Sequence, residues 1–264
     1  MYIFDRDTAL TEVAEGRWTV QLESGWCVGS IPNGGYLGAI SAAATGASLP
    51  HPDPVTSTTH YLRPCAVGPA EIRVEVLKVG RGHSTALATL SQGGKDRFVT
   101  MATYGDLDAA TGATFHGAAA PQLPPVQDCW SLEGTGEWLP EIARRFDFRY
   151  PAAARSAFAA ESEVAELSGW IRFADGREPD ARSLLTFADA FPPPIRAVMN
   201  IGWVPTIELT VHVKARPSPG WLRATFKTGW CQDGYLEEDG QLWDSRDRLV
   251  AVSRQLARVT QDMP

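Results

Sequence analysis

The sequence has no long apolar run, and its first residues carry charge. Asp5, Arg6 and Asp7 stand where a secretory signal peptide needs an apolar segment. No later stretch reaches the ~18 apolar residues that a membrane-spanning helix requires. We therefore expect a cytoplasmic protein that is neither exported nor inserted in a membrane.

Basic clusters and paired cysteines are also missing. The formal net charge is -7, and no run of Lys and Arg exceeds a pair. This argues against a nucleic-acid partner, because phosphates are met by a basic face. The four cysteines are far apart and show no CxxC spacing: Cys27, Cys65, Cys129 and Cys231. We expect buried free thiols, no disulfide and no metal.

Common catalytic motifs are absent as well. The sequence contains no GxSxG nucleophile elbow, HExxH zinc motif, Walker lysine loop or GxGxxG fingerprint. A serine hydrolase, a zinc protease and a dinucleotide-binding enzyme are therefore disfavoured, and no cofactor is implied.

Two segments of the first half recur in the second. Residues 60–64 resemble residues 212–217, and residues 96–99 resemble residues 247–250. The two pairs keep their order, with offsets of 152 and 151 residues. Similar segments at one spacing indicate a duplicated domain, and a duplicated fold often builds its site between the copies. The positions where the copies differ are then the place to look for chemistry.

Proline and alanine mark the segment between the copies. Residues 118–125 hold three alanines and three prolines, a composition that neither a helix nor a central strand tolerates. We expect an N-terminal repeat over residues 1–108, a linker over 109–145 and a C-terminal repeat over 146–264.

The first repeat predicts one strand, one helix and a meander of four strands. The helix is rich in small residues, which suits a helix lying close against a sheet. The expected elements are a strand at 17–22, a turn at 30–35, a helix at 36–47 and strands at 55–62, 70–79, 84–91 and 97–104.

The second repeat predicts the same order. A strand at 168–173 is followed by a helix near 183–199 and by strands at 206–214, 221–228, 231–243 and 248–259. Three prolines at 192–194 interrupt the helical segment, so the helix begins there or is broken there.

A strand, a helix and a four-stranded antiparallel meander, all repeated once, are the plan of a double hotdog. Residues 32–37, 62–64, 242–245 and 248–255 together resemble the acyl-CoA thioesterase II family and its bacterial relatives. The resemblance covers nearly all of the chain outside the linker. It implies an α+β double hotdog, two tandem hotdog repeats each with an antiparallel sheet wrapped round a central helix.

The resemblance also implies three catalytic residues. Asp189 takes the place of an Asp at the start of the second helix, Thr206 opens the next strand, and Gln255 lies in the last strand. Such an Asp deprotonates water while Thr and Gln fix its position, because a thioester is electrophilic enough to need no covalent nucleophile. Glu208 is a second carboxylate that competes for the role of base.

Each of these residues also has a structural interpretation. Asp189 is a suitable helix N-cap, Thr206 a good strand residue, and Gln255 an alternating strand position. His60 and His212 recur in both repeats and are interpreted as structural.

The turn before the first helix predicts an oxyanion site. Backbone N–H groups of Gly34 and Gly35 would point at an anion with no side chain in the way. The two glycines also suit a tight turn that lets the helix pack closely, and the two interpretations are compatible. The first copy is then expected to supply the oxyanion hole and the second copy the base.

The implied activity is hydrolysis of an acyl-CoA to a free acid and CoA. We expect an acyl pocket that includes Tyr36, Phe191 and Trp203, and a homo-oligomer by analogy with other hotdog proteins. The alternatives are a hotdog protein that binds acyl thioesters without cleaving them, and an acyl-CoA hydratase or dehydratase of the same fold.

Overall fold

Strands make up most of the regular structure in the computed structural model, which describes residues 1–132 and 139–260. The α-helices are α1 (Ile3–Asp7), α2 (Gly34–Ser48), α3 (Arg155–Phe158) and α4 (Leu184–Phe187), and the 3-10 helices are η1 (Ser24–Trp26), η2 (Val126–Asp128), η3 (Glu141–Arg145), η4 (Ala152–Ala154) and η5 (Pro194–Ala197). The strands of the first repeat are β1 (Thr11–Ala14), β2 (Arg17–Leu22), β3 (Cys27–Val28), β4 (Ile31–Pro32), β5 (Asp53–Tyr61), β6 (Gly68–Val79), β7 (Ser84–Gln92) and β8 (Lys95–Gly105). Those of the second repeat are β9 (Phe146–Arg149), β10 (Glu166–Phe173), β11 (Thr206–Val213), β12 (Leu222–Lys227), β13 (Cys231–Gln232), β14 (Tyr235–Trp243) and β15 (Leu249–Arg258).

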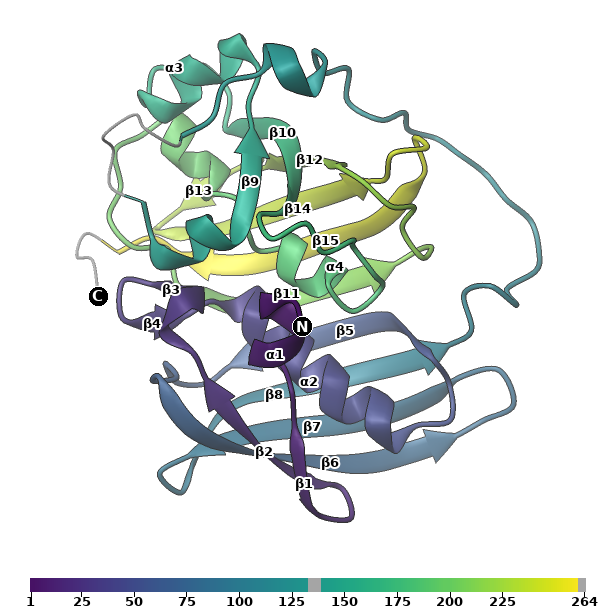
Figure 1. The fold of residues 1–264 in the computed structure, drawn as a ribbon. Coiled ribbons are helices and arrows are strands. Elements are labelled where there is room, and N and C mark those ends of the chain that lie inside the picture. The colour runs from purple at the N-terminus through teal and green to yellow at the C-terminus, as the bar shows by residue number, and fades with distance from the viewer. Residues whose placement is uncertain (133–138, 261–264) are drawn as a thin grey trace.

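One antiparallel sheet passes through both repeats. Within the described residues it holds 13 strands in the order β1-β2-β6-β7-β8-β5-β11-β15-β14-β12-β10-β9, with β13 beside β14. Figure 1 shows the first repeat below and the second above, with β5 and β11 meeting between them. Each half of the sheet curves over helical structure, so the double hotdog predicted from the sequence is confirmed.

The register of β5 on β11 confirms the duplication. Thr58 lies directly opposite Thr210, and their hydroxyls are hydrogen bonded at 2.9 Å. These residues are 152 positions apart, which is the offset between residues 60–64 and 212–217. A residue that faces its own repeat equivalent across an antiparallel pair marks a local twofold axis. The axis that relates the repeats therefore passes between Thr58 and Thr210.

The expected four-stranded meander is only partly correct. Strands β6, β7 and β8 are successive neighbours, but β5 pairs with β8 and β11 instead of β6. The second repeat does the same, because β11 pairs with β15. Sequence periodicity identifies strands without fixing their partners. The strand after each helix thus forms the junction between the repeats.

The helix expected at 36–47 is α2. The side chain of Asn33 accepts a hydrogen bond from the Tyr36 N–H at 3.0 Å, so the helix begins at Gly34, two residues before the prediction. Most of α2 is buried, including Tyr36, Leu37 and Ile40. Its small residues let the sheet wrap closely around it.

The helix expected near 183–199 is broken, which was one of the two outcomes expected from its prolines. Only the four residues of α4 are α-helical, and the separate 3-10 helix η5 begins at Pro194. Proline lacks the N–H that a helix interior needs, and its ring collides with the preceding turn, so the run at 192–194 ends the helix. Asp189 accordingly follows α4. It neither starts a helix nor serves as an N-cap.

Two further expectations need correction or stay open. The strand expected at 231–243 is a hairpin, because Asp233 and Gly234 both adopt positive φ between β13 and β14. The linker expected at 109–145 contains η2 and η3, and residues 133–138 lie outside the described residues. The proposed repeat boundaries stay a prediction.

The cysteines are unpaired thiols. Cys27 and Cys65 are buried, and burial raises their pKa values to about 11 and about 12. Cys129 and Cys231 are half-buried. None of the helices in the described part of the chain has the length and apolar character needed to cross a membrane.

Candidate active site

A carboxylate of the second repeat meets the first turn of the first repeat's helix. Asp189 Oδ2 accepts hydrogen bonds from the Gly35 N–H at 2.8 Å and from Asn33 Nδ2 at 2.9 Å. Asn33 Nδ2 also donates to the Asp189 carbonyl oxygen at 2.9 Å. The positive end of a helix dipole stabilises a nearby anion. Both repeats therefore build the surroundings of Asp189.

Close packing of α4 on α2 explains the glycine at position 35. A Cβ atom there would lie 2.8 Å from Asp189 Cβ and 2.8 Å from the Leu185 carbonyl oxygen. Thr186 Oγ1 donates to the Gly35 carbonyl at 3.2 Å and ties the two helices together. The glycine thus allows a close approach to α4 and Asp189, whereas the sequence predicted a close approach to the sheet.

The carboxyl of Asp189 is a stronger base than an ordinary aspartate. Burial raises its pKa to about 6, while hydrogen bonds from Gly35, Asn33 and Gly34 act in the opposite direction. A carboxyl with this pKa is mostly ionised at neutral pH and still accepts a proton readily. Its environment therefore suits a general base.

The N–H expected to stabilise an oxyanion has a carboxylate partner in the structure, because Gly35 donates to Asp189. The Gly34 carbonyl accepts a hydrogen bond from the Tyr61 hydroxyl at 2.8 Å. A Cβ on Gly34 would lie 2.8 Å from the Tyr61 hydroxyl and 3.0 Å from Asp189 Oδ2, so both groups crowd this turn. The oxyanion role of Gly34 and Gly35 stays a prediction, and Tyr61 is a neighbour that the sequence did not indicate.

A β-bulge turns Thr206 to the inner face of the sheet. The register of β11 on β15 shifts between Thr206 and Glu208, which places Thr206 opposite the buried Ala257. A bulge adds a residue to one strand and so re-aims a side chain. Thr206 Oγ1 consequently donates to Gln255 Oε1 at 2.7 Å. Two of the three predicted catalytic residues are thus in direct contact.

Gln255 is buried and lies opposite a second buried residue, Glu238 of β14. Burial raises the pKa of Glu238 to about 8, the charge of Asp189 raises it further, and a hydrogen bond from Gln255 lowers it. The influence of the Asp189 charge on the pKa of Glu238 is consistent with Asp189 lying near the Thr206–Gln255 pair. That the three residues form one catalytic site stays a prediction.

Sequence reasoning missed Glu238 because 231–243 was interpreted as a single strand. Once β14 begins at Tyr235, alternation places Leu236, Glu238 and Gly240 on the buried side. A carboxylate on the apolar side of an alternating strand is the signal that would have identified it.

Glu208, the competing carboxylate, has a different position. It faces the exposed His60 across the junction, and Thr210 Oγ1 donates to Glu208 Oε1 at 2.5 Å. The bulge that brings Thr206 inward leaves Glu208 opposite Leu256, the outward neighbour of Gln255. Glu208 therefore lies on the outer face of the sheet, away from the Thr206–Gln255 pair.

The three residues expected around an acyl chain differ in burial and in their neighbours. Tyr36 is fully buried, stacks on Trp26 with ring centroids 5.0 Å apart and donates to the Asp7 carbonyl, so it is a core residue. Phe191 is buried against Phe226, and Trp203 is half-buried. The acyl-lining roles of Tyr36, Phe191 and Trp203 stay a prediction.

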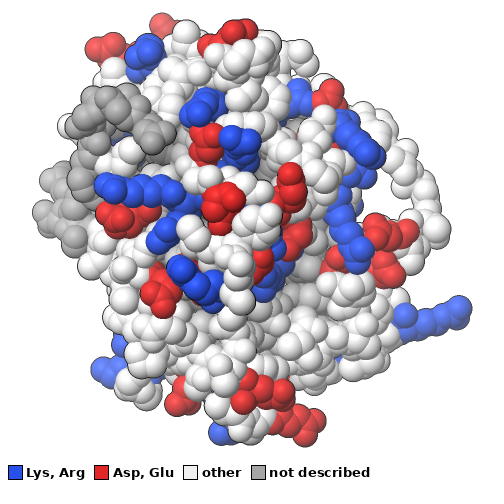
Figure 2. All heavy atoms as spheres, viewed as in Figure 1, with Lys and Arg blue, Asp and Glu red and all other residues white. Residues whose placement is uncertain are grey.

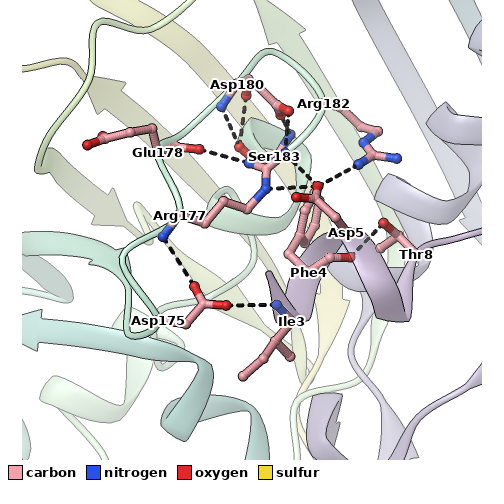
Figure 3. A network of polar contacts seen from close by, with 10 residues as sticks. All are labelled: Ile3, Phe4, Asp5, Thr8, Asp175, Arg177, Glu178, Asp180, Arg182 and Ser183. Carbon is pink, nitrogen blue, oxygen red and sulfur yellow. Dashed lines mark hydrogen bonds and ion pairs between the residues drawn. The ribbon is translucent and has the colours of Figure 1, made fainter. Parts of the chain in front are cut away.

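The N-terminal helix anchors the loop that precedes α4. Figure 3 shows Asp5 of α1 between two guanidinium groups, with Arg177 Nη2 at 2.9 Å and Arg182 Nη2 at 3.3 Å. Arg177 is only 9% exposed and also binds Asp180, whose carboxylate accepts from the Ser183 N–H at 2.7 Å. Removing either carboxylate would leave the buried Arg177 guanidinium with one partner fewer. This network fixes the start of α4, and with it the approach to Asp189.

A cavity of about 580 Å³ lies beside the C-terminal half of α2, away from Asp189. Ala42, Pro54, Tyr104 and Arg216 are among its lining residues. Arg216 is already ion-paired with Asp53 at 2.8 Å.

The charged groups of the surface are mixed in sign. In the face drawn in Figure 2, acidic and basic side chains of the described residues lie among one another. Within those residues no group of three or more His, Cys, Asp or Glu is arranged to hold a metal ion.

Comparison with known families accounts for both repeats. The profile of the acyl-CoA thioesterase N-terminal domain matches residues 22–105, and that of the acyl-CoA thioesterase C-terminal domain matches residues 122–259. These two matches leave out only the ends of the chain and the segment between the repeats.

Solved structures and sequence relatives agree with this result. A protein from Thermobifida fusca YX, proposed to be a thioesterase II, is 34% identical, with a TM-score of 0.91 over 98% of each chain. A hot dog protein of unknown function from Alicyclobacillus acidocaldarius is 21% identical, with a TM-score of 0.87 over 98% of each chain, which shows the fold alone. The thioesterase-like protein TwmA of Talaromyces wortmannii is 24% identical over 97% of this chain and 92% of its own.

Proposed function

We propose that this chain, which belongs to the acyl-CoA thioesterase family, hydrolyses an acyl-CoA to a free acid and CoA with a water directed by Asp189, Thr206 and Gln255. The observation that supports this proposal most strongly is the placement of Asp189. It is held at the N-terminus of α2 by two hydrogen bonds, with a pKa raised by burial to about 6.

The reaction needs one proton acceptor and one attacking water. Asp189 removes a proton from the water while the water oxygen forms a bond to the thioester carbonyl carbon. When the tetrahedral intermediate collapses, the carbon–sulfur bond breaks and the proton passes from Asp189 to the departing thiolate. Asp189 returns to its ionised state, so no other reactant is required.

Thr206 and Gln255 orient this water. The hydroxyl hydrogen of Thr206 points to Gln255 Oε1, so the Thr206 oxygen offers only lone pairs to a third group. A water that donates one hydrogen to Thr206 and the other to Asp189 presents its own lone pair to the substrate. Such positioning removes much of the entropy cost of the reaction.

The setting of the enzyme is proposed as well. The substrate class is acyl-CoA, the location cytoplasmic and the assembly a homo-oligomer. Strand β1 ends the first repeat's side of the sheet and is exposed along its length, which leaves an edge where another copy can associate.

The test measures thiol release from acyl-CoAs of increasing chain length. Wild type is compared with Asp189→Asn, which keeps the shape but cannot accept the proton, and with Glu208→Gln as the matched control on the outer face. We expect the Asn variant to lose roughly 100-fold or more in kcat and the Gln variant to match wild type.

Three results would contradict the proposal in different ways. Equal activity of wild type and Asp189→Asn would remove Asp189 from the role of base, and loss in Glu208→Gln would transfer that role to Glu208. Absence of thiol release from every acyl-CoA, with a melting temperature that rises on adding them, would favour a noncatalytic binding protein.

A further inference from the structure

Glu238 is a buried carboxyl that the proposed chemistry does not use. It is 5% exposed and lies on β14 directly opposite Gln255. Its Oε2 atom is buried and has no hydrogen-bond partner within the described residues. An unsatisfied buried oxygen is costly, so its presence needs an explanation.

Burial, helped by nearby negative charge, favours the neutral form of Glu238. The groups that act on its carboxyl are Asp189, Asp239 and the amide of Gln255, and Asp239 is itself paired with Arg254 at 2.6 Å. Burial, followed by the charge of Asp189, raises the pKa of Glu238 to about 8. At neutral pH Glu238 is therefore mostly protonated, and it does not compete with Asp189 as a base.

The residue directly opposite Glu238 is Gln255, whose side-chain amide has two different ends. Gln255 Oε1 accepts the Thr206 hydroxyl, so the end of the amide left to face Glu238, directly opposite on β14, is the Nε2 donor. A flipped amide would turn its NH₂ group toward Thr206 and its oxygen toward Glu238. Thr206 would then lose its acceptor and could no longer present lone pairs alone to the water.

We infer that Glu238 is a positioning residue, whose carboxyl fixes the orientation of the Gln255 amide and thereby the direction of the Thr206 hydroxyl. The inference rests on the proposed function, because it assigns Glu238 a part in directing the same water. Glu238 acts through Gln255 and does not touch the substrate.

The first repeat supports this pairing by contrast. Ser57 and Leu209 are equivalent positions of the two repeats. Ser57 lies opposite Ala102 and Leu209 lies opposite Gln255, so Ala102 corresponds to Gln255. The residue opposite Ala102 on the neighbouring strand is Ala86, which corresponds to Glu238. The carboxyl and the amide are thus both present in one repeat and both replaced by alanine in the other.

The kinetic test uses four single variants and one double variant. Glu238→Met removes the acceptor at similar size and should lower kcat about tenfold with KM changed less than about twofold. Glu238→Gln keeps an oxygen for Gln255 Nε2 and should restore most of that loss. Glu237→Met, the neighbour on the other face of β14, is the matched control. In a Gln255→Ala background, Glu238→Met should have no further effect, because Glu238 acts only through that amide.

A second measurement is independent of turnover. The side-chain amide resonances of Gln255, followed by NMR as the pH is raised through 8, should shift in wild type and stay constant in Glu238→Gln. This readout also decides the matter if Glu238→Met fails to fold. A wild type without thiol release but with this shift would contradict the proposed hydrolysis and leave the pairing supported.

The inference is overturned by wild-type kcat in Glu238→Met, or by an equal loss in the Gln255→Ala background. It is also overturned if the Gln255 amide does not respond to the titration. An unchanged Glu238→Gln rate together with a reduced Glu238→Met rate supports it.

Discussion

The two repeats share a fold but differ in the residues that line the inner face of the sheet. Where the second repeat has Gln255 and Glu238, the register gives the first repeat Ala102 and Ala86. Thr206 likewise corresponds to Pro54, which lines the cavity beside α2. At these three positions the first repeat has apolar side chains, whereas the second has polar side chains that need partners.

For the helices, it is the first repeat that has the more complete element. α2 runs for 15 residues and offers its capped N-terminus, whereas α4 stops after four residues. Because the chain leaves the helix before Asp189, this carboxylate can reach across to Asn33 and Gly35. The intact helix therefore supplies hydrogen-bond donors, and the broken helix frees the acceptor. The surroundings of Asp189 thus depend on both repeats and on the difference in length between their helices.

Making the second repeat resemble the first should have the largest effect. Gln255→Ala removes the acceptor of the Thr206 hydroxyl and should lower kcat roughly 100-fold, because the water is no longer held in place. Ala102→Ser, at the matched position of the first repeat, should leave kcat unchanged. Steady-state thiol release with both variants checks this. Equal losses would mean that the repeats contribute alike.

The acidic side of the pH profile of kcat/KM should report the pKa of Asp189. Asp189 must be ionised to accept a proton, and burial raises its pKa to about 6, so kcat/KM should rise as the pH passes upward through this value. Activity at pH 5 should be about tenfold below that at pH 7.

Removing the Asn33 amide, a hydrogen-bond donor of the first repeat, should shift the acidic side of the pH profile. The Asn33 amide favours the ionised carboxylate, so Asn33→Ala should shift the midpoint to higher pH. The measurement is the pH dependence of kcat/KM for both proteins at matched ionic strength. A midpoint that is the same in both would show that the first repeat does not tune Asp189.

Packing between the helices should give the smallest change in rate. Gly35→Ala places a methyl group 2.8 Å from Asp189 Cβ and should destabilise the fold by about 1–3 kcal/mol, with a few-fold loss of activity. Gly38→Ala meets nothing closer than Leu185 Cδ2 at 3.8 Å and should be neutral or stabilising by up to about 1 kcal/mol. Urea unfolding of the two variants compares them directly. Similar free energies of unfolding would argue against the close contact.

The fold was predictable where local pattern and tertiary structure agree. The strand at 17–22 and the helix of the first repeat were found within two residues, because turn residues and small apolar side chains mark them. The strand order was not predictable from periodicity, since β5 pairs with β8 and β11 through contacts distant in sequence. The break in the second helix was signalled by its prolines, but the sequence did not say how short the helical part before them is.

The candidate site was predictable only where a family resemblance supplied it. Asp189, Thr206 and Gln255 came from matching segments, and the structure brings Thr206 onto Gln255 through a bulge that leaves no trace in the sequence. Tyr61 and Glu238 were missed because their neighbours, the Gly34 carbonyl and Gln255, are distant from them in the sequence. Partners of buried polar groups are set by register, which a one-residue shift changes completely.

The most direct measurement follows the oxygen of water through one turnover. In ¹⁸O-labelled water with enzyme in excess over acyl-CoA, a water directed by Asp189 should place the label in the released acid and none in the peptide that contains Asp189. Label in the carboxylate of Asp189 would show that this residue attacks the thioester itself, and would contradict the account.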